Sequence, residues 1–112
     1  MEKKLRIRCW ITLDQEKFFG PGRLQLLTLI ESEGSLSKAA QQMGMSYKKA
    51  WDMVNDLNSR GSQPYVLLKK GGEKGGGAEI TRHAELLISR FRVLEENLEN
   101  LAISEAAILD MI

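Results

Sequence analysis

The sequence predicts a mainly α-helical domain that carries a small β hairpin, and three features of the chain support this. Apolar residues recur at helical spacing in four segments between Pro21 and Leu101. Two short apolar runs, residues 65–70 and 78–80, flank the glycine-rich stretch Gly71–Gly77, as strands flank the tip of a hairpin. The length of 112 residues suits one small domain. We therefore expect one compact unit, with a body over residues 1–81 and a C-terminal helix and tail over residues 82–112.

The chain begins with a predicted strand. Residues 5–13 alternate strictly between apolar and polar side chains, which is typical of a half-buried strand. Cys9 lies in the apolar row, so we expect a buried structural thiol there. Residues 14–20 are expected to form a turn-like connection. Pro21 favours the first turn of a helix, and Gly34 is a suitable residue to end that helix.

The next two predicted helices are short and close together. Ser35 or Ser37 can cap a helix that reaches about Met43. Gly44 can adopt the positive φ that a tight turn requires, and Ser46 can cap a third helix that reaches about residue 58. A helix, a tight turn containing glycine and a second helix together indicate a helix-turn-helix.

The third helix has two distinct faces. At about 100° per residue, its apolar face contains Tyr47, Ala50, Trp51, Met53, Val54 and Leu57. The opposite face is polar and has Lys48 and Lys49 in its first turn, which is the arrangement that a DNA-recognition helix needs. Trp51 is therefore expected in the core and Trp10 on a sheet face. The sequence does not indicate that either ring stacks on DNA.

A hairpin with a glycine-rich, lysine-containing tip follows the helix-turn-helix. This order is typical of a winged helix, in which the wing holds the phosphate backbone of DNA. Lys69, Lys70 and Lys74 are the expected contacts, and a surface loop without a binding role is the alternative. A nucleotide-binding loop is excluded because the order G-x-x-x-x-G-K-[ST] is absent.

The last predicted helix starts after a Thr81 cap and reaches at least Leu101. Large apolar residues recur along it with the spacing of a short coiled-coil seam: Leu87, Phe91, Leu94, Leu98 and Leu101. This seam predicts a dimer interface, and packing on the body of the same chain is the alternative. Residues 102–112 form an apolar extension, in which a short helix capped by Ser104 is possible. A two-fold dimer would present two recognition helices to a two-fold-related DNA site.

The charges are unevenly distributed, although the net charge is only +1. Residues 1–82 carry 14 Lys and Arg against 9 Asp and Glu (+5), and residues 83–112 carry 2 against 6 (−4). The basic excess coincides with the predicted DNA-facing elements. One cysteine and one histidine give no cluster for zinc. Since His83 is expected to face solvent and has no nucleophile to pair with, we expect no enzyme activity, no cofactor and no metal.

The sequence also contains no apolar stretch approaching the roughly 18–20 residues that a membrane span needs. We therefore expect no membrane partner and, with a single cysteine, a reducing cytoplasmic location.

Several of these segments resemble one protein family. Residues 34–40 and 45–51, with Asn55 and Asn58, are similar to the N-terminal domain of the molybdate-responsive ModE regulators, as is the wing run Gly71–Gly77 with residues 78–82. The helix-turn-helix alone would suggest the broader LysR-like winged helices. The resemblance covers residues 5–101. It implies a prokaryotic transcription factor that dimerises through its N- and C-terminal elements. The family binds molybdate in a separate C-terminal domain, which we expect this chain to lack, so a separate effector or sensor protein is a possible partner.

Together these features predict a dimeric, sequence-specific binder of double-stranded DNA. The expected base-facing residues are Ser46, Tyr47, Lys48, Lys49, Asp52 and Asn55. The expected phosphate-facing residues are Ser37, Lys38, Lys69, Lys70 and Lys74. The alternative is a winged-helix module that docks proteins and does not bind DNA specifically, which the modest net charge favours.

Overall fold

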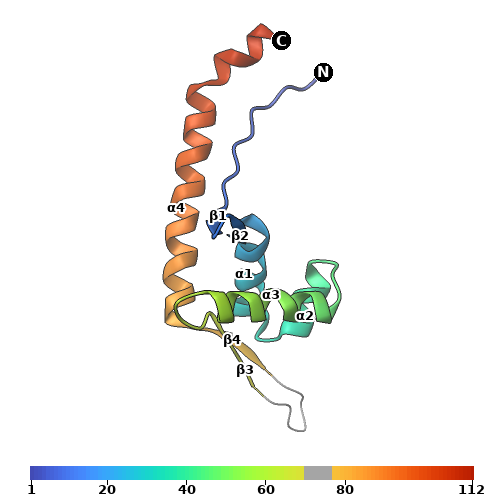
Figure 1. The fold of residues 1–112 in the computed structure, drawn as a ribbon. Coiled ribbons are helices and arrows are strands. Elements are labelled where there is room, and N and C mark those ends of the chain that lie inside the picture. The colour runs from blue at the N-terminus through green and yellow to red at the C-terminus, as the bar shows by residue number, and fades with distance from the viewer. Residues whose placement is uncertain (70–76) are drawn as a thin grey trace.

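The computed structural model describes residues 1–69 and 77–112 and has the predicted mainly helical fold with a small β wing. Its elements, in chain order, are β1 (Ile11–Leu13), β2 (Glu16–Phe19), α1 (Pro21–Glu33), α2 (Leu36–Gln42), α3 (Tyr47–Arg60), β3 (Val66–Leu68), β4 (Ala78–Ile80), α4 (Arg82–Ser104) and the 3-10 helix η1 (Ala106–Met111). Figure 1 shows α1, α2 and α3 packed into a body from which the β3–β4 hairpin projects at one end. Helix α4 runs past this body and extends beyond it at the other end.

The helices begin and end where the sequence predicts. Pro21 is the first residue of α1, and Gly34 follows α1 with a φ of 65°. The side chains of Ser35, Ser46 and Thr81 each accept a backbone N–H bond in the first turn of α2, α3 and α4. These bonds satisfy backbone donors that have no partner inside the helix. The predicted caps are therefore confirmed, with Ser35 rather than Ser37 at the start of α2.

The N-terminal strand is much shorter than predicted. Only Ile11–Leu13 forms β1, and it pairs with a second strand, β2, in the segment that was expected to be a turn-like connection. Asp14 and Gln15 form the turn between them with φ values of 50° and 71°. Ile11 pairs with Phe19, and α1 begins two residues later. Residues 1–10 therefore extend past the end of β2 and form no strand.

The apolar alternation of this N-terminal segment is nevertheless visible in its burial. Leu5, Ile7 and Cys9 are half-buried, whereas Arg6 and Arg8 are exposed. Cys9 is thus only partly covered rather than buried as expected. Figure 1 shows the segment running beside the far half of α4. The Lys3 ammonium donates to the backbone oxygens of residues 109 and 112, so the two ends of the chain lie together.

The core lies between α1 and the elements around it. Leu26, Leu27 and Ile30 of α1 are fully buried. The ring of Phe19 meets the ring of Phe91 edge to face, with 5.1 Å between ring centroids. This contact holds the first half of α4 against the body of the same chain.

The predicted α4 seam is therefore divided between two environments. Phe91 is buried in the core and Leu87 is half-buried against it, so for these two residues the alternative of packing on the same chain holds. Leu94 and Leu101 are exposed, and Leu98 is half-buried. Only the later part of the seam remains accessible to a second copy.

The C-terminal tail forms a 3-10 helix without the predicted cap. Ser104 Oγ donates to the Leu101 backbone oxygen instead, and Glu105 precedes η1 without a side-chain capping bond. Among the described helices, none is long and apolar enough to cross a membrane.

Candidate nucleic-acid interface

The polar face of α3 is open to solvent. Ala50, Val54 and Leu57 on its opposite face are buried in the core, which fixes the rotation of the helix. The residues predicted to face DNA bases are all exposed in this arrangement: Ser46, Tyr47, Lys48, Lys49, Asp52 and Asn55.

Within this face, Lys48 and Asp52 form an ion pair one helical turn apart. The distance from Lys48 Nζ to Asp52 Oδ2 is 3.2 Å, and the two side chains are 83% and 53% exposed. Exposed pairs of this kind contribute only about 0–1 kcal/mol. A ligand can therefore separate the two side chains at little cost.

The starts of α2 and α3 lie next to the base of the wing. A hollow of about 170 Å³ is lined by Ser35, Leu36, Ser37, Tyr47, Leu68, Lys69 and Gly77. It brings together three residues predicted from separate segments to face DNA: Ser37, Tyr47 and Lys69. Gly44, with a φ of 66°, provides the tight turn that brings α2 and α3 close together. Lys38, also predicted to contact phosphate, is exposed.

The base of the wing is fixed by backbone hydrogen bonds. The Lys69 N–H donates to the Gly77 oxygen at 2.8 Å, and the Ala78 N–H donates to the Gly34 oxygen at 3.0 Å. The second bond ties β4 to the end of α1. Lys69 Nζ lies 3.5 Å from Glu79 Oε2, with both side chains exposed. Lys70 and Lys74, the other predicted wing contacts, lie outside the described residues.

Asn58 fixes the position of the wing relative to α3. Its Nδ2 donates to the Val66 oxygen at 2.9 Å. Its Oδ1 accepts from the backbone N–H groups of Tyr65 and Val66. This structural role of Asn58 was not predicted from the sequence. One feature of the sequence could have indicated it: Asn58 is an amide side chain near the end of α3, next to a loop whose backbone groups need hydrogen-bond partners.

Asp56 also belongs to the polar half of α3, but it is engaged inside the protein. Its Oδ2 lies 2.6 Å from Arg23 Nη1 and 3.0 Å from Arg60 Nη1. Burial by itself raises the pKa of Asp56, but the hydrogen bonds and charges of the two arginines outweigh this effect and lower the pKa below its ordinary value. Asp56 thus links α3 to α1 and has no role in the proposed DNA-facing surface.

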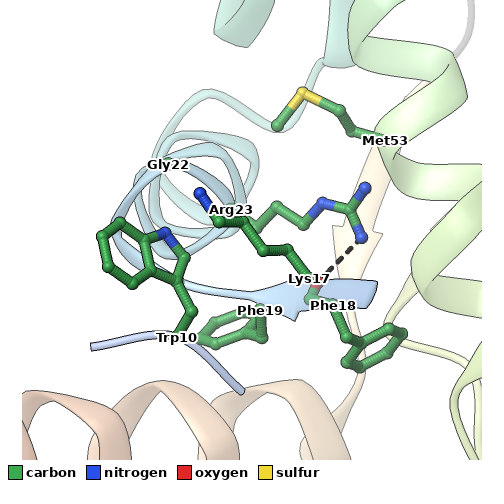
Figure 2. Close-up of a pocket in the computed structure, with 8 residues that line it drawn as sticks. Trp10, Lys17, Phe18, Phe19, Gly22, Arg23 and Met53 are labelled. Atoms are coloured by element: carbon green, nitrogen blue, oxygen red, sulfur yellow. Dashed lines mark hydrogen bonds between the residues drawn. The ribbon is translucent and has the colours of Figure 1, made fainter. Parts of the chain in front are cut away.

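A second small hollow, with a volume of about 190 Å³, is lined by Arg23 together with Trp10 and Lys17 (Figure 2). The Arg23 guanidinium donates to the Phe18 backbone oxygen at 2.8 Å. Lys17 Nζ lies 4.3 Å from the centroid of the Trp10 ring. A Cβ at Gly20 would lie 2.4 Å from the Trp10 Cδ1 atom, so only glycine allows the indole to lie there. The two cationic side chains that line the hollow, Lys17 and Arg23, therefore already have partners.

Three aromatic predictions need correction. Trp10, expected on a sheet face, precedes β1 and belongs to no strand. Trp51, expected in the core, is 42% exposed, because the side of α3 that carries it is not fully covered. His83, expected to face solvent, is half-buried with its ring 5.0 Å from the ring of Tyr65. Among the described residues, no group of three or more His, Cys, Asp or Glu side chains could hold a metal ion.

A helix-turn-helix with an exposed polar helix and an adjacent wing defines the chain as a winged helix-turn-helix module. No protein-family model matches the chain. It is 42% identical to the transcriptional regulator ModE of Yersinia pestis over 84 residues, 75% of this chain and 32% of that protein. It is 38% identical to the DNA-binding transcriptional dual regulator ModE of Escherichia coli K12 over 86 residues, 77% of this chain and 33% of that protein.

A third relative is the molybdenum-pterin-binding protein MopA of Rhodobacter capsulatus, 42% identical over 76 residues, 68% of this chain and 29% of that protein. The chain spans about a third of the length of these relatives. The resemblance to the ModE regulators is confirmed, and the module is ModE-like.

Two solved structures share the fold, and one of them is a LysR-type regulator. Full-length LysG from Corynebacterium glutamicum superposes with a TM-score of 0.59 and 20% identity, over 84% of this chain and 30% of that one. ArgP from Mycobacterium tuberculosis superposes with a TM-score of 0.52 and 17% identity, over 78% of this chain and 30% of that one. At these identities the likeness concerns the fold alone, and it confirms the predicted winged-helix fold.

Proposed function

We propose that this chain is a dimeric, sequence-specific DNA-binding transcriptional regulator that inserts α3 into the major groove. The observation that carries the proposal is the exposed polar face of α3, with the start of α2 and the base of the wing beside it. The names of the ModE relatives support a regulatory rather than an enzymatic role. A prokaryotic DNA-binding regulator would act in the cytoplasm, and a separate effector or sensor protein remains a predicted partner.

In this proposal the exposed residues of α3 divide into two roles. Tyr47, Lys48 and Lys49 are near the N-terminal end of the recognition helix, which meets base edges first, with Ser46 before them. Asp52 and Asn55 lie at the margin of the groove. The phosphate contacts are Ser37, Lys38 and Lys69, together with Lys70 and Lys74 of the wing. Each lysine on a phosphate adds about one unit to the salt dependence of binding.

Exposed apolar residues on α4 support the dimer. Leu86, Val93, Leu94 and Leu101 are between 40% and 50% exposed and lie on one side of the helix, away from the core-facing Phe91. We call these four residues the α4 stripe. An unpartnered row of this kind on a DNA-binding module suits a two-fold helix pair, which would place two recognition helices on one duplex. The interface in this proposal consists of the α4 stripe and Leu98.

The test starts from selection of bound sequences out of a random duplex pool. Wild-type protein is expected to enrich a motif with two related halves. Replacing Lys48 and Lys49 together by alanine should weaken binding to that motif at least tenfold and reduce the salt slope, while the thermal unfolding curve stays unchanged.

The matched control is Lys4→Ala with Arg6→Ala, which removes the same charge from the segment at the opposite end of the molecule from the wing (Figure 1). Because both residues lie near Leu98 of the proposed dimer interface, sedimentation first checks that this variant is as dimeric as wild type; it should then bind nearly as wild type does. Normal binding by the Lys48/Lys49 double variant would overturn the recognition-helix assignment. Absence of binding to any duplex at low salt would favour the protein-docking alternative instead.

A further inference from the structure

Three exposed apolar side chains lie where α3 meets the wing. Tyr47 is 54% exposed, Trp51 is 42% exposed, and Leu68 of β3 is 43% exposed. We call these three residues the apolar corner. None of the three is buried in the core, and only Tyr47 already belongs to the proposed base-facing residues.

Two contacts place β3 along the side of α3 that carries Trp51. At one end, Asn58 binds the backbone of Val66, the first residue of β3. At the other end, Tyr47 and Leu68 line the same hollow. Trp51 follows Tyr47 by four residues and precedes Asn58 by seven, spacings that put all three on one side of a helix. Trp51 therefore lies on the side of α3 that carries both contacts with β3.

The apolar corner is continuous with the proposed base-facing surface. Lys48 precedes Trp51 by three residues and Asn55 follows it by four, so both are its direct neighbours on the helix surface. Both are exposed. A duplex that meets Lys48 and Asn55 would also cover the indole of Trp51.

The chemistry of the major groove suits such a surface. The edges of the base pairs are polar there, except for the C5-methyl group of thymine, which apolar side chains contact. The polar residues of α3 can form hydrogen bonds with base edges but cannot recognise this methyl group. Trp51, Tyr47 and Leu68 offer the apolar contact that α3 otherwise lacks.

We propose that the apolar corner reads thymine methyl groups, with Trp51 as the specificity-determining residue. This inference rests on the proposed DNA-binding function. It adds a preference for thymine at one or two positions of each half-site, on the flank of the recognition helix that faces the wing.

The experiment uses the selected duplex with each thymine replaced in turn by deoxyuridine, which removes the methyl group and keeps the base pair. For wild-type protein, one or two replacements per half-site should each weaken binding about fourfold, the effect of withdrawing one buried methyl-sized group. For Trp51→Ala, the same replacements should have no effect, because the contact has already been removed. Trp51→Phe should retain part of the penalty.

Lys38→Ala is the matched control. It removes a predicted phosphate contact and should weaken binding to every duplex while leaving the deoxyuridine penalty unchanged. Thermal unfolding of Trp51→Ala checks that the variant is folded, and Trp51→Phe provides the same comparison if it is not.

Three results would overturn the inference. They are neutral deoxyuridine replacement at all positions in wild type, a penalty of equal size in folded Trp51→Ala, and a selected motif without thymine. Selection that enriches no motif would instead contradict the proposed function, on which this inference depends.

Discussion

The carboxylate of Asp56 shows how one residue on the polar half of α3 can serve the fold rather than the ligand. Its side chain is 27% exposed, and those of Arg23 and Arg60 are 22% and 28% exposed. Since the two guanidinium groups also bind backbone oxygens of the β1–β2 hairpin, the three side chains connect this hairpin, α1 and α3. Such a partly buried, multiply bonded group contributes more to stability than an exposed ion pair does.

The lowered pKa of Asp56 predicts how this contribution depends on pH. A carboxylate with a lowered pKa in the folded state stabilises the fold above its unfolded pKa of about 4, and the contribution is lost as the pH falls through the folded-state value. Asp56→Asn should therefore be less stable than wild type by about 1–2 kcal/mol at pH 7. The difference should shrink below about pH 4. Urea unfolding at a series of pH values measures it.

Asp52→Asn is the control for that series, because Asp52 is exposed and pairs only with Lys48 among the described residues. It should change stability by less than about 0.5 kcal/mol at every pH. A difference between wild type and Asp56→Asn that stayed constant from pH 7 to strongly acidic pH would contradict the role given to the arginine pair.

At the scale of elements, the start of α3 combines a structural and a proposed functional role. Ser46 Oγ accepts the Lys49 N–H at 3.0 Å, and the helix start is where α3 would enter the groove. Ser46→Ala should lose about 1 kcal/mol of stability through the missing cap. Ser46→Asp should restore the cap, since a carboxylate is favourable at a helix N-terminus.

The order of the two variants in DNA affinity should be the reverse of their order in stability. The carboxylate of Ser46→Asp would face the phosphate-rich groove, so this variant should bind the selected duplex more weakly than Ser46→Ala, although it is more stable. Urea unfolding and duplex titration measure the two properties separately. Equal binding by Ser46→Asp and wild type would show that the start of α3 does not approach DNA.

The elements also show which structural information is local. The helix ends follow from Ser46, Thr81 and Gly34, because a cap involves residues within one turn. The N-terminal strand was overpredicted because alternation indicates an extended segment but not its partner. Here Pro21 starts α1 directly after β2, so no strand remains to pair with residues 5–10.

The candidate site also has features that local sequence predicts and features that depend on contacts between distant segments. Helical spacing was enough to predict that Lys48, Lys49 and Asn55 are exposed. It could not predict that Trp51 is exposed, because that depends on how far β3 covers the side of α3. The bonds of Asn58 to Tyr65 and Val66 tie the start of β3 to α3, and they join residues that no periodicity relates.

At the scale of the whole molecule, the elongated shape separates two regions. The principal extents are 59, 31 and 22 Å, and the far half of α4 accounts for much of the length (Figure 1). The acidic residues Glu95, Glu96 and Glu99 lie on this half, away from the wing and the start of α3. The acidic residues of α4 therefore lie away from the proposed DNA-facing surface. The basic N-terminal residues Lys3, Lys4, Arg6 and Arg8 also lie at this end, beside the acidic half of α4, so the uneven charge of the sequence is only partly separated in space.

The α4 stripe gives the proposed dimer a definite orientation. Its members Leu86, Val93, Leu94 and Leu101 are symmetric about the midpoint between residues 93 and 94. A two-fold antiparallel pair centred there would place Leu86 opposite Leu101 and Val93 opposite Leu94. A parallel pair would place each member opposite its own copy, whereas the antiparallel pair also brings Arg82 near Glu105 of the second copy.

Cysteine cross-linking in a Cys9→Ser background distinguishes the two orientations, with a dimer first verified by sedimentation. In the antiparallel pair, neither Leu86→Cys nor Leu101→Cys should form a disulfide on its own. When the two variants are mixed before oxidation, the mixed dimers should form a disulfide, because only there do two thiols come within bonding distance. Val93→Cys lies near the two-fold axis and should form a disulfide with the same residue of the second copy. Glu96→Cys lies on another side of α4 and should not form one. Efficient cross-linking of Leu86→Cys alone would demonstrate a parallel pair. Because a parallel pair relates the two bodies differently, that result would also change the half-site spacing expected of the selected duplex.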